Sequence, residues 1–305
     1  MMNKHLVVIA GPTGVGKTDL CIQLALRFNT VIISSDSRQI YKELKIGTAA
    51  PTDEQLNQVK HHSIGNKSVY DYYNASKFEV EVLKLLNTLF VQHDIVLMTG
   101  GSGLYIDALC YGIDDLPEVD QEIRLSLHDK YSNEGIEPLR SMLKKLDPKH
   151  FAKVDLKNHK RLLKALEVCL QTGKPYSSFL TQNKKKRDFN IIMIGLNRER
   201  EELYDRINQR THQMIEKGLV EETRLIVSQH PDYRKLNALN TVGYKEIFSY
   251  LDGKIDLMEA IDLIQRNTRK YARKQITWFR KYDEMAWFHP DEINKIIDYI
   301  EKSIK

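Results

Sequence analysis

Residues 5–18 read His-Leu-Val-Val-Ile-Ala-Gly-Pro-Thr-Gly-Val-Gly-Lys-Thr. The run 5–10 is short, apolar and bounded by glycine, so it predicts a buried β-strand. Residues 11–18 then match the phosphate-loop pattern G-x-x-x-x-G-K-[ST] at every fixed position. In such a loop successive N–H groups face one anion, and the following helix adds the positive end of its dipole. We therefore predict a P-loop that holds a diphosphate or triphosphate through Gly11, Pro12, Thr13, Gly14, Val15, Gly16, Lys17 and Thr18.

Strand-like runs and helical periods alternate on the C-terminal side of this loop. In chain order they are 17–28 (helix), 30–34 (strand), 74–90 (helix), 94–99 (strand), 189–195 (strand) and 285–288 (short strand). Buried strands that alternate with helices form a parallel sheet covered on both faces. The sequence thus predicts an α/β fold, a P-loop NTPase-like parallel sheet with helices on both faces.

The pattern changes after Pro117, where about seventy residues carry only helical periods and no strand-like run. The economical interpretation is an insertion into the α/β core. We expect a core domain made of residues 1–114 and 189–305, including the C-terminal helices, and an all-helical insertion domain at 115–188.

The composition is that of an ordinary globular protein, with 42% apolar and 29% charged residues among 305. No apolar run approaches the roughly 20 residues that a membrane span needs. The three cysteines are widely spaced and give neither a disulfide framework nor a metal-ligand pattern. We therefore expect a cytoplasmic protein with no membrane partner, and nothing in the sequence suggests more than a monomer.

The net charge of +5 is concentrated in two segments. Residues 153–187 hold ten Lys or Arg against two acids, and residues 266–281 hold seven against none. On a helix, the basic residues of the second segment gather on one face, which suits contacts with phosphates. The distribution predicts a polyanionic partner.

Acidic residues near the sheet distinguish between kinds of P-loop protein. Many ATPases and GTPases carry an acid after a second apolar strand, to organise magnesium. The strand at 94–99 ends instead in Thr-Gly-Gly, which favours a transferase over a motor or switch. Asp36 follows the strand at 30–34, and ligands of doubly wound sheets lie outside the carboxyl ends of strands. Asp36 is therefore a candidate catalytic acid or base.

Seven segments together resemble the bacterial tRNA dimethylallyltransferases, also called tRNA isopentenyltransferases. They are 11–18, Ser-Asp-Ser-Arg-Gln-Ile-Tyr at 35–41, Ile-Gly-Thr-Ala at 46–49, Gly-Gly-Ser-Gly-Leu-Tyr at 100–105, Arg-x-x-Lys-Ala-Leu-Glu-Val at 161–168, Val-Gly-Tyr-Lys-Glu at 242–246 and Arg-Lys-Gln-Ile-Thr-Trp-Phe-Arg at 273–280. The resemblance runs from about residue 6 to 281.

The resemblance implies transfer of a dimethylallyl group from its diphosphate to an adenine N6 amine in tRNA. The target lies immediately 3′ of the anticodon, in tRNAs that read codons beginning with U. The P-loop would hold the donor's diphosphate, Thr13, Lys17, Thr18 and Arg224 would form the clamp, and Thr18 would bind Mg²⁺. Asp36 would be the general base. The residues so implicated in catalysis are Asp36, Lys17, Thr18, Arg224 and Ser102.

The resemblance also implies contacts with the tRNA anticodon stem-loop. The positions concerned are Asp36, Ser37, Arg38, Gln39, Ser102, Arg124, Lys160, Arg161, Leu162, Leu163, Lys164, Gly243, Tyr244 and Lys245. Two residues depart from the family's usual pattern. Ser102 stands where threonine is common and keeps the hydroxyl. Lys164 stands where arginine is usual, and loses a guanidinium's two-pronged geometry.

Three alternatives remain open at this level. A small-molecule P-loop kinase would also place an acid near its acceptor. An adenylate isopentenyltransferase would prenylate free nucleotides with the same chemistry. A nucleotide-gated RNA-binding protein would have no catalytic need of Asp36.

Overall fold

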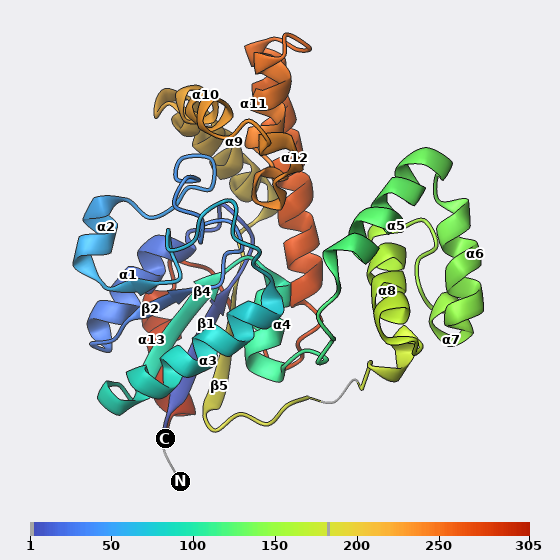
Figure 1. Cartoon of the computed structure of the whole chain (residues 1–305). Coiled ribbons are helices and arrows are strands. Elements are labelled where there is room, and N and C mark those ends of the chain that lie inside the picture. Colours follow the sequence, from blue (N-terminus) through green and yellow to red (C-terminus); the bar gives the residue numbers. More distant parts are fainter. Residues whose placement is uncertain (1–2, 182–183) are drawn as a thin grey trace. The chain divides into compact units, whose positions relative to one another are not determined.

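The computed structural model describes residues 3–181 and 184–305. Its centre is a parallel sheet of six strands in the order β3-β2-β4-β1-β5-β6. Figure 1 labels four neighbouring strands of this sheet, β2, β4, β1 and β5. The strands are β1 (His5–Ala10), β2 (Ile32–Ser34), β3 (His61–His62), β4 (Ile95–Gly100), β5 (Asn190–Leu196) and β6 (Ala286–Phe288). The P-loop strand β1 lies between β4 and β5. The predicted parallel α/β sheet is confirmed.

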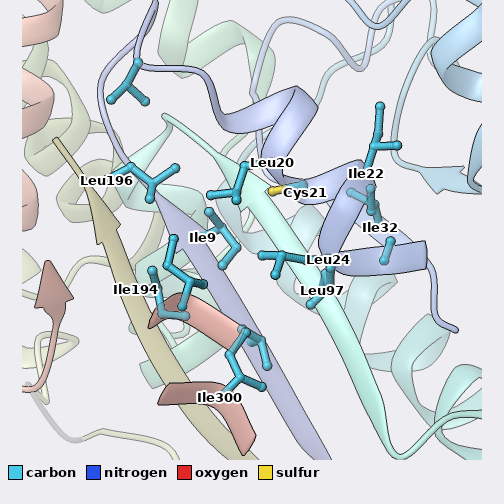
Figure 2. Close-up of a cluster of buried hydrophobic side chains, with 14 of the residues drawn as sticks. Ile9, Leu20, Cys21, Ile22, Leu24, Ile32, Leu97, Ile194, Leu196 and Ile300 are labelled. Carbon is cyan, nitrogen blue, oxygen red and sulfur yellow. The ribbon is translucent and has the colours of Figure 1, made fainter. Parts of the chain in front are cut away.

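Both faces of β1 are covered, because all six of its residues are buried. Successive side chains point to opposite faces of a strand. Val7 and Ile9 belong to the cluster formed with α1 and α13, which Figure 2 shows at close range. Leu6 and Val8 are equally buried on the opposite face. This two-sided burial explains why the strand reads as a continuous apolar run.

Nine helices accompany the sheet in the described part of the core. They are α1 (Lys17–Arg27), α2 (Asp53–Gln58), α3 (Ala75–Gln92), α4 (Gly103–Tyr111), α9 (Arg200–Glu216), α10 (Leu219–Gln229), α11 (Tyr244–Leu251), α12 (Leu257–Phe279) and α13 (Ile293–Ser303). Helix α3 begins at the side-chain cap of Asn74, whose oxygen accepts the N–H of Lys77. Its buried stripe, which includes Phe78, Val82 and Leu86, has the spacing of a helix that covers a sheet.

The chain divides into two compact units, one running to Cys110 and resuming at Arg187, the other spanning Tyr111–Lys186. The described residues of the second unit form helices and no strand. These helices are α5 (Gln121–Glu134), α6 (Glu137–Leu146), α7 (Pro148–Phe151) and α8 (His159–Thr172). Leucines at 127, 139, 143, 162 and 166 make its separate apolar core. The sequence-based boundaries of this helical domain, 115–188, differ by a few residues.

Arg187 marks the return of the chain to the core. Its guanidinium forms a 2.7 Å ion pair with Glu79, and the two side chains are 8% and 6% exposed. It also donates to the carbonyls of Ala108 and Leu109, at the end of α4. The basic segment 153–187 therefore ends, just before β5, in a buried residue that stabilises the core.

Two short elements escaped the sequence analysis. Strand β3 has only two residues, His61 and His62, which is too short to show a period. Helix α2 has no buried residue, so its sequence lacks the apolar stripe that would predict a helix. Its start was nevertheless readable, since Thr52 and Gln55 form a capping box.

Candidate active site

The carboxyl ends of three neighbouring strands bring the predicted site segments together. Ala10 pairs with Gly100 across β1 and β4, and Ser34 pairs with Thr99 across β2 and β4. The P-loop, the Asp36 turn and the Ser102 loop therefore leave the sheet at one edge. This convergence follows from the parallel strand order, and it is the position expected for a ligand site.

The P-loop has the backbone that its glycines predict. Gly14 and Gly16 have φ values of 82° and 106°, a region that side chains other than glycine rarely adopt. Helix α1 follows at once, with Gly16 as N-cap and no side-chain cap. The N–H groups of its first turn are thus left to an anion. The Nζ of Lys17 donates to the carbonyls of Gly11 at 2.9 Å and Pro12 at 2.8 Å.

Positive charge is crowded around this loop. Burial and repulsion by Arg210 lower the pKa of Lys17 to about 8, although attraction by Asp36 acts in the opposite direction. A cation whose charge is disfavoured in this way gains most from an anionic ligand. The electrostatics at Lys17 therefore match the predicted phosphate-binding role.

Two arginines that the sequence analysis did not single out hold the outer side of the P-loop. The Nε of Arg206 donates to the carbonyl of Gly14 at 2.9 Å, and the Nε of Arg198 donates to that of Val15 at 2.9 Å. Arg198 is further paired with Glu202 and Asp291. In a loop whose N–H groups point toward an anion, the carbonyls point away from it. The two arginine bonds satisfy these carbonyls.

Asp36 closes a tight turn after β2. Its Oδ1 accepts the N–H of Arg38 at 2.8 Å and that of Gln39 at 3.3 Å. The residue is half-buried. Burial lowers the pKa of Lys17 and of Arg210, and the negative charge of Asp36 offsets this lowering in part. One carboxylate oxygen thus fixes the turn, while the described hydrogen bonds leave Oδ2 free to accept a proton.

Ser102 holds the same turn from the neighbouring strand. Its Oγ accepts the N–H of Ser37 at 3.0 Å and lies 3.1 Å from the Ser37 hydroxyl. Gln39 completes the arrangement by donating to the carbonyls of Thr48 and Ala49. The structure therefore brings together Asp36, Ser37, Gln39 and Ser102 as the sequence analysis expected, and it adds the loop at 48–49 to them.

Gln275 of α12 ties the P-loop to the Ser102 loop. Its Oε1 accepts the N–H of Thr13 and its Nε2 donates to the carbonyl of Gly101, both at 2.9 Å. A Cβ at Gly101 would lie only 2.1 Å from that nitrogen, so a larger residue there would displace the Gln275 amide from this bridge. One turn earlier on α12, burial raises the pKa of Tyr271 to about 12, with Asp36 reinforcing the shift and hydrogen bonds to Ser102 and Gln275 opposing it. Its hydroxyl thus borders the site next to Ser102 and Gln275.

Glu222 of α10 links two of the segments that carry the family resemblance, 46–49 and 242–246. Its carboxylate accepts the N–H groups of Lys45, Ile46 and Gly47 and the hydroxyl of Tyr244, at 2.7–3.1 Å. A Cβ at Gly47 would lie 2.5 Å from the Tyr244 ring, so this contact also needs glycine. Tyr244 is fully buried, and its side chain supports the loop that carries Thr48.

Other predicted residues of the core differ in exposure, from Arg224 on the surface to the buried Gly243. Arg224 is on α10 with its side chain 57% exposed, and its ion-pair partner is Glu221 at 3.8 Å. The structure describes no contact between Arg224 and the P-loop. Lys245 is also exposed, and Gly243 starts α11 with φ of 100°. Arg38 donates to the carbonyl of Asn237 at 2.9 Å. The roles predicted for these residues stay predictions.

The predicted tRNA contacts of the helical unit separate into exposed and buried side chains. Lys160 and Arg161 are exposed in the first turn of α8, and Lys164 is half-exposed. Leu162 and Leu163 are buried in the core of that unit. Arg124 on α5 pairs with Glu167 at 3.4 Å. Any side-chain contact from the first turns of α8 therefore falls to its basic residues.

A second basic group lies on α12 and α9. Arg266, Lys270 and Arg273 are exposed on α12, and Arg280 is exposed directly after its last residue, as the helical spacing predicts. Arg273 donates to the hydroxyl of Tyr204, whose pKa is lowered by that bond and by Arg200 against the opposing effect of burial. The exposed basic face is suited to phosphates.

Two features are absent from the described residues. No helix in residues 3–181 and 184–305 is long and apolar enough to cross a membrane. Within the same residues, no three His, Cys, Asp or Glu side chains gather in a way that could hold a metal ion.

Comparison with known proteins gives the family. The sequence profile described as IPP transferase matches residues 39–282. tRNA dimethylallyltransferase 1 of Bacteroides fragilis is 55% identical over 305 residues, covering 100% of both chains. The protein of the same name from Bacteroides thetaiotaomicron is 54% identical over 295 residues, covering 97% of this chain and 94% of its own.

Solved structures agree with these relatives. The full-length tRNA isopentenylpyrophosphate transferase of Bacillus halodurans superposes with a TM-score of 0.72 at 35% identity, covering 99% of this chain and 97% of its own. A eukaryotic dimethylallyltransferase that acts on tRNA gives a TM-score of 0.74 at 26% identity, covering 90% of this chain and 69% of its own. The chain therefore belongs to the IPP transferase family, the tRNA dimethylallyltransferases.

Proposed function

We propose that this enzyme transfers a dimethylallyl group from dimethylallyl diphosphate to the N6 amine of the adenine immediately 3′ of the anticodon. Its substrates are tRNAs that read codons beginning with U. The observation that carries the proposal is the convergence of the P-loop, the Asp36 turn and Ser102 at one edge of the sheet. Family membership supports tRNA as the acceptor.

The P-loop binds the diphosphate of the donor. Free N–H groups at the start of α1 and the charge of Lys17 provide the anion site. When the allylic C–O bond breaks, its electron pair stays on the diphosphate, and the same groups stabilise the developing charge. Residues 11–18 therefore serve both binding and leaving-group departure.

Asp36 is the general base. An adenine N6 amine is a weak nucleophile because its lone pair is delocalised into the ring. The amine forms the new C–N bond to the allylic carbon and gives one proton to the carboxylate. Asp36 is held for this role through Oδ1 alone, and Ser102 fixes the turn that carries it.

Magnesium is the proposed cofactor, held mainly by the substrate. Thr18 offers a half-buried hydroxyl in the first turn of α1. No carboxylate cage gathers in the described residues, which fits an ion that takes most of its oxygens from a diphosphate and water. When bound, the ion would neutralise charge on the leaving diphosphate.

Exposed basic residues support tRNA as the acceptor. They occur on α12 and at its C-cap, at Arg266, Lys270, Arg273 and Arg280, and in the first turn of α8, at Lys160 and Arg161. Such groups contact phosphates without reading sequence, so they set the position of the stem-loop and not the choice of base.

A direct assay tests the proposal. The purified enzyme is incubated with labelled dimethylallyl diphosphate, Mg²⁺ and either unmodified tRNA, AMP or ATP. Label in tRNA alone is the expected result. Label in AMP or ATP would instead identify a nucleotide prenyltransferase, and ATP turnover without prenyl transfer would identify a kinase or ATPase.

The base assignment has its own test. Asp36→Asn keeps the Oδ1 acceptor but cannot take the proton, so we expect transfer to fall by at least about a hundredfold. Binding of tRNA should change little. Asp298→Asn, which alters an exposed acid of α13, is the matched control and should keep full activity. Normal transfer by Asp36→Asn would refute the general-base role.

A further inference from the structure

Glu222 of α10 is a carboxylate held mainly by backbone groups of a distant segment. Its two oxygens accept the N–H groups of residues 45–47 at 2.9–3.1 Å, and Oε1 also accepts the hydroxyl of Tyr244 at 2.7 Å. These described partners include no basic side chain. Hydrogen bonds to a charged acceptor are about twice as strong as neutral ones. Glu222 therefore fixes the backbone at 45–47.

This use of the side chain is unusual for its position. Glu221 and Glu222 both lie in the first turn of α10, where an acid ordinarily favours its own helix through the helix dipole. Glu221 is exposed and pairs with Arg224 on the same helix. Glu222 instead gives its acceptor positions to backbone that lies 175–177 residues away in the chain. A role for Glu222 in placing that segment follows.

The segment 45–47 continues into two carbonyls that hold Gln39. The Nε2 of Gln39 donates to the carbonyl of Thr48 at 3.3 Å and to that of Ala49 at 3.1 Å. Ala49 has a φ of 46°, in the left-handed region that residues other than glycine rarely adopt. Such a conformation persists only where surrounding contacts impose it. The anchor at 45–47 is one of these contacts, so the place of both carbonyls depends on Glu222.

Gln39 connects this loop with the turn that carries Asp36. Its backbone N–H donates to Oδ1 of Asp36 at 3.3 Å, and its Oε1 accepts the hydroxyl of Ser34 at 3.3 Å. Both ends of the Gln39 amide are thus engaged, one by the loop and one by the end of β2. A shift of the two loop carbonyls would move Gln39, and with it one of the two N–H groups that orient Asp36.

We propose that Glu222 is a positioning residue for prenyl transfer: it fixes the loop at 45–49, which holds Gln39 and thereby the turn that carries Asp36. This role rests on the proposed function, in which Asp36 takes the proton of the adenine amine. Glu222 does not touch the reacting atoms. Misplacing a reacting group by about 1 Å can lower a rate by about a hundredfold, so the rate of the chemical step is the quantity that Glu222 controls.

Hydrogen exchange followed by mass spectrometry tests the positioning without reference to activity. In Glu222→Gln, either orientation of the amide sets an NH2 group, which cannot accept, against at least one N–H of 45–47. We expect exchange to become at least about tenfold faster in 45–49 and also in 37–39. Residues 78–90 of α3 should exchange as in the wild type. The matched control is Glu216→Gln, an exposed acid of α9, which should change neither segment.

Two results of the exchange measurement would overturn the inference. Faster exchange in 45–49 with unchanged exchange in 37–39 would mean that Glu222 holds only its own loop. Equal acceleration in α3 would show a general loss of stability in place of positioning. Glu222→Asp keeps the charge but is one methylene shorter, so it should give the same pattern with a smaller change. It replaces Glu222→Gln if that variant does not fold.

Single-turnover kinetics with saturating donor and tRNA give the second test. Glu222→Gln should lower the rate of transfer by about tenfold to a hundredfold, while KM for the donor stays within about twofold. Gln39→Met cannot donate to the loop carbonyls and should also slow transfer. In the Gln39→Met background, Glu222→Gln should have almost no further effect, because the two residues act through one contact. Effects that multiply would contradict positioning through Gln39.

Failure of the proposed function would give a different result. A wild-type enzyme that does not transfer the prenyl group to tRNA would refute that function. The exchange comparison would still decide whether Glu222 holds the turn that carries Asp36, since it needs no substrate.

Discussion

Gln275 and Thr13 are separated by 262 residues and joined by one hydrogen bond of 2.9 Å. The other end of the same amide donates to the carbonyl of Gly101 at 2.9 Å. One buried side chain on α12 therefore sets the spacing between the P-loop and the loop that carries Ser102. This contact explains why a glutamine stands at position 275 in the Gln-Ile-Thr-Trp segment.

Replacing Gln275 by methionine should weaken both stability and donor binding. The change keeps the volume but leaves the Thr13 N–H and the Gly101 carbonyl unpaired. Each unsatisfied buried group costs about 1–3 kcal/mol. We expect the free energy of unfolding, measured with urea, to fall by at least the cost of one such unpaired group. The KM for the donor should rise.

The control for Gln275 lies on the same helix. Among the described residues, the side-chain amide of Gln265 contacts His212, at 3.1 Å near the surface, so Gln265→Met should leave the free energy of unfolding almost unchanged. Equal behaviour of the two variants would show that the bridge between the loops has no energetic weight.

Tyr244→Phe tests the contact with Glu222. The change removes a hydroxyl that donates to a carboxylate at 2.7 Å in a fully buried position. Hydrogen bonds to charged groups contribute about 1.5–3 kcal/mol, and we expect a loss of that size in urea unfolding. Tyr250→Phe on the same helix is the control and should have no effect. A wild-type stability for Tyr244→Phe would mean that the three backbone N–H groups alone hold Glu222.

The sequence predicted most of the sheet and the centre of the site, for clear reasons. β1 is buried on both faces and therefore reads as a continuous apolar run, and the P-loop pattern is local. Asp36 was identified because parallel strands bring their carboxyl ends to one edge. Each of these inferences needs only neighbouring residues or a general rule of topology.

Arg210 and Gln275 were missed as site residues because their roles depend on which helices meet. A signal for Arg210 did exist. Leu203, Ile207 and Thr211 form the buried face of α9, and Arg206 and Arg210 occupy the same helical face where apolar residues are expected. An arginine in that position predicts a buried partner, but the sequence does not name it. Arg224 has no such signature, and its predicted role rests on the resemblance alone.

Glu79→Ala should be among the most destabilising single changes in the core. It leaves the guanidinium of Arg187 buried without its carboxylate, and breaking one side of a buried pair costs about 3–5 kcal/mol. Urea unfolding of the variant measures the loss. The double replacement Glu79→Leu with Arg187→Met removes both charges and should recover most of the stability.

A surface ion pair provides the comparison for Glu79. Lys295 of α13 is exposed and pairs with Glu292, the N-cap of that helix, and Lys295→Ala should cause no measurable change. If Glu79→Ala were equally harmless, water would have to reach Arg187, contrary to the 8% exposure of its side chain.

Asp147 gives the helical unit a stability that depends on pH. The residue is buried, and burial alone would raise its pKa, but the N–H groups of Ser177 and His150 and the Ser177 hydroxyl outweigh this and lower it below the ordinary 3.8. A carboxyl group with a depressed folded pKa stabilises the fold fully above its unfolded pKa. The stabilisation by Asp147 is lost as the pH falls through the pKa of its carboxyl in the folded protein.

Asp147→Asn should therefore be less stable than the wild type at pH 7 by about 1–3 kcal/mol, since the amide is uncharged and its NH2 group cannot accept the N–H of Ser177 as Oδ2 does. The difference should shrink as the pH falls below about 4, where the wild-type carboxyl also becomes neutral. Urea unfolding followed at pH 7, 5, 4 and 3 measures both quantities. Asp155→Asn, at a more exposed loop position, is the control. A difference that stayed constant down to pH 3 would mean that shape, and not charge, makes Asp147 stabilising.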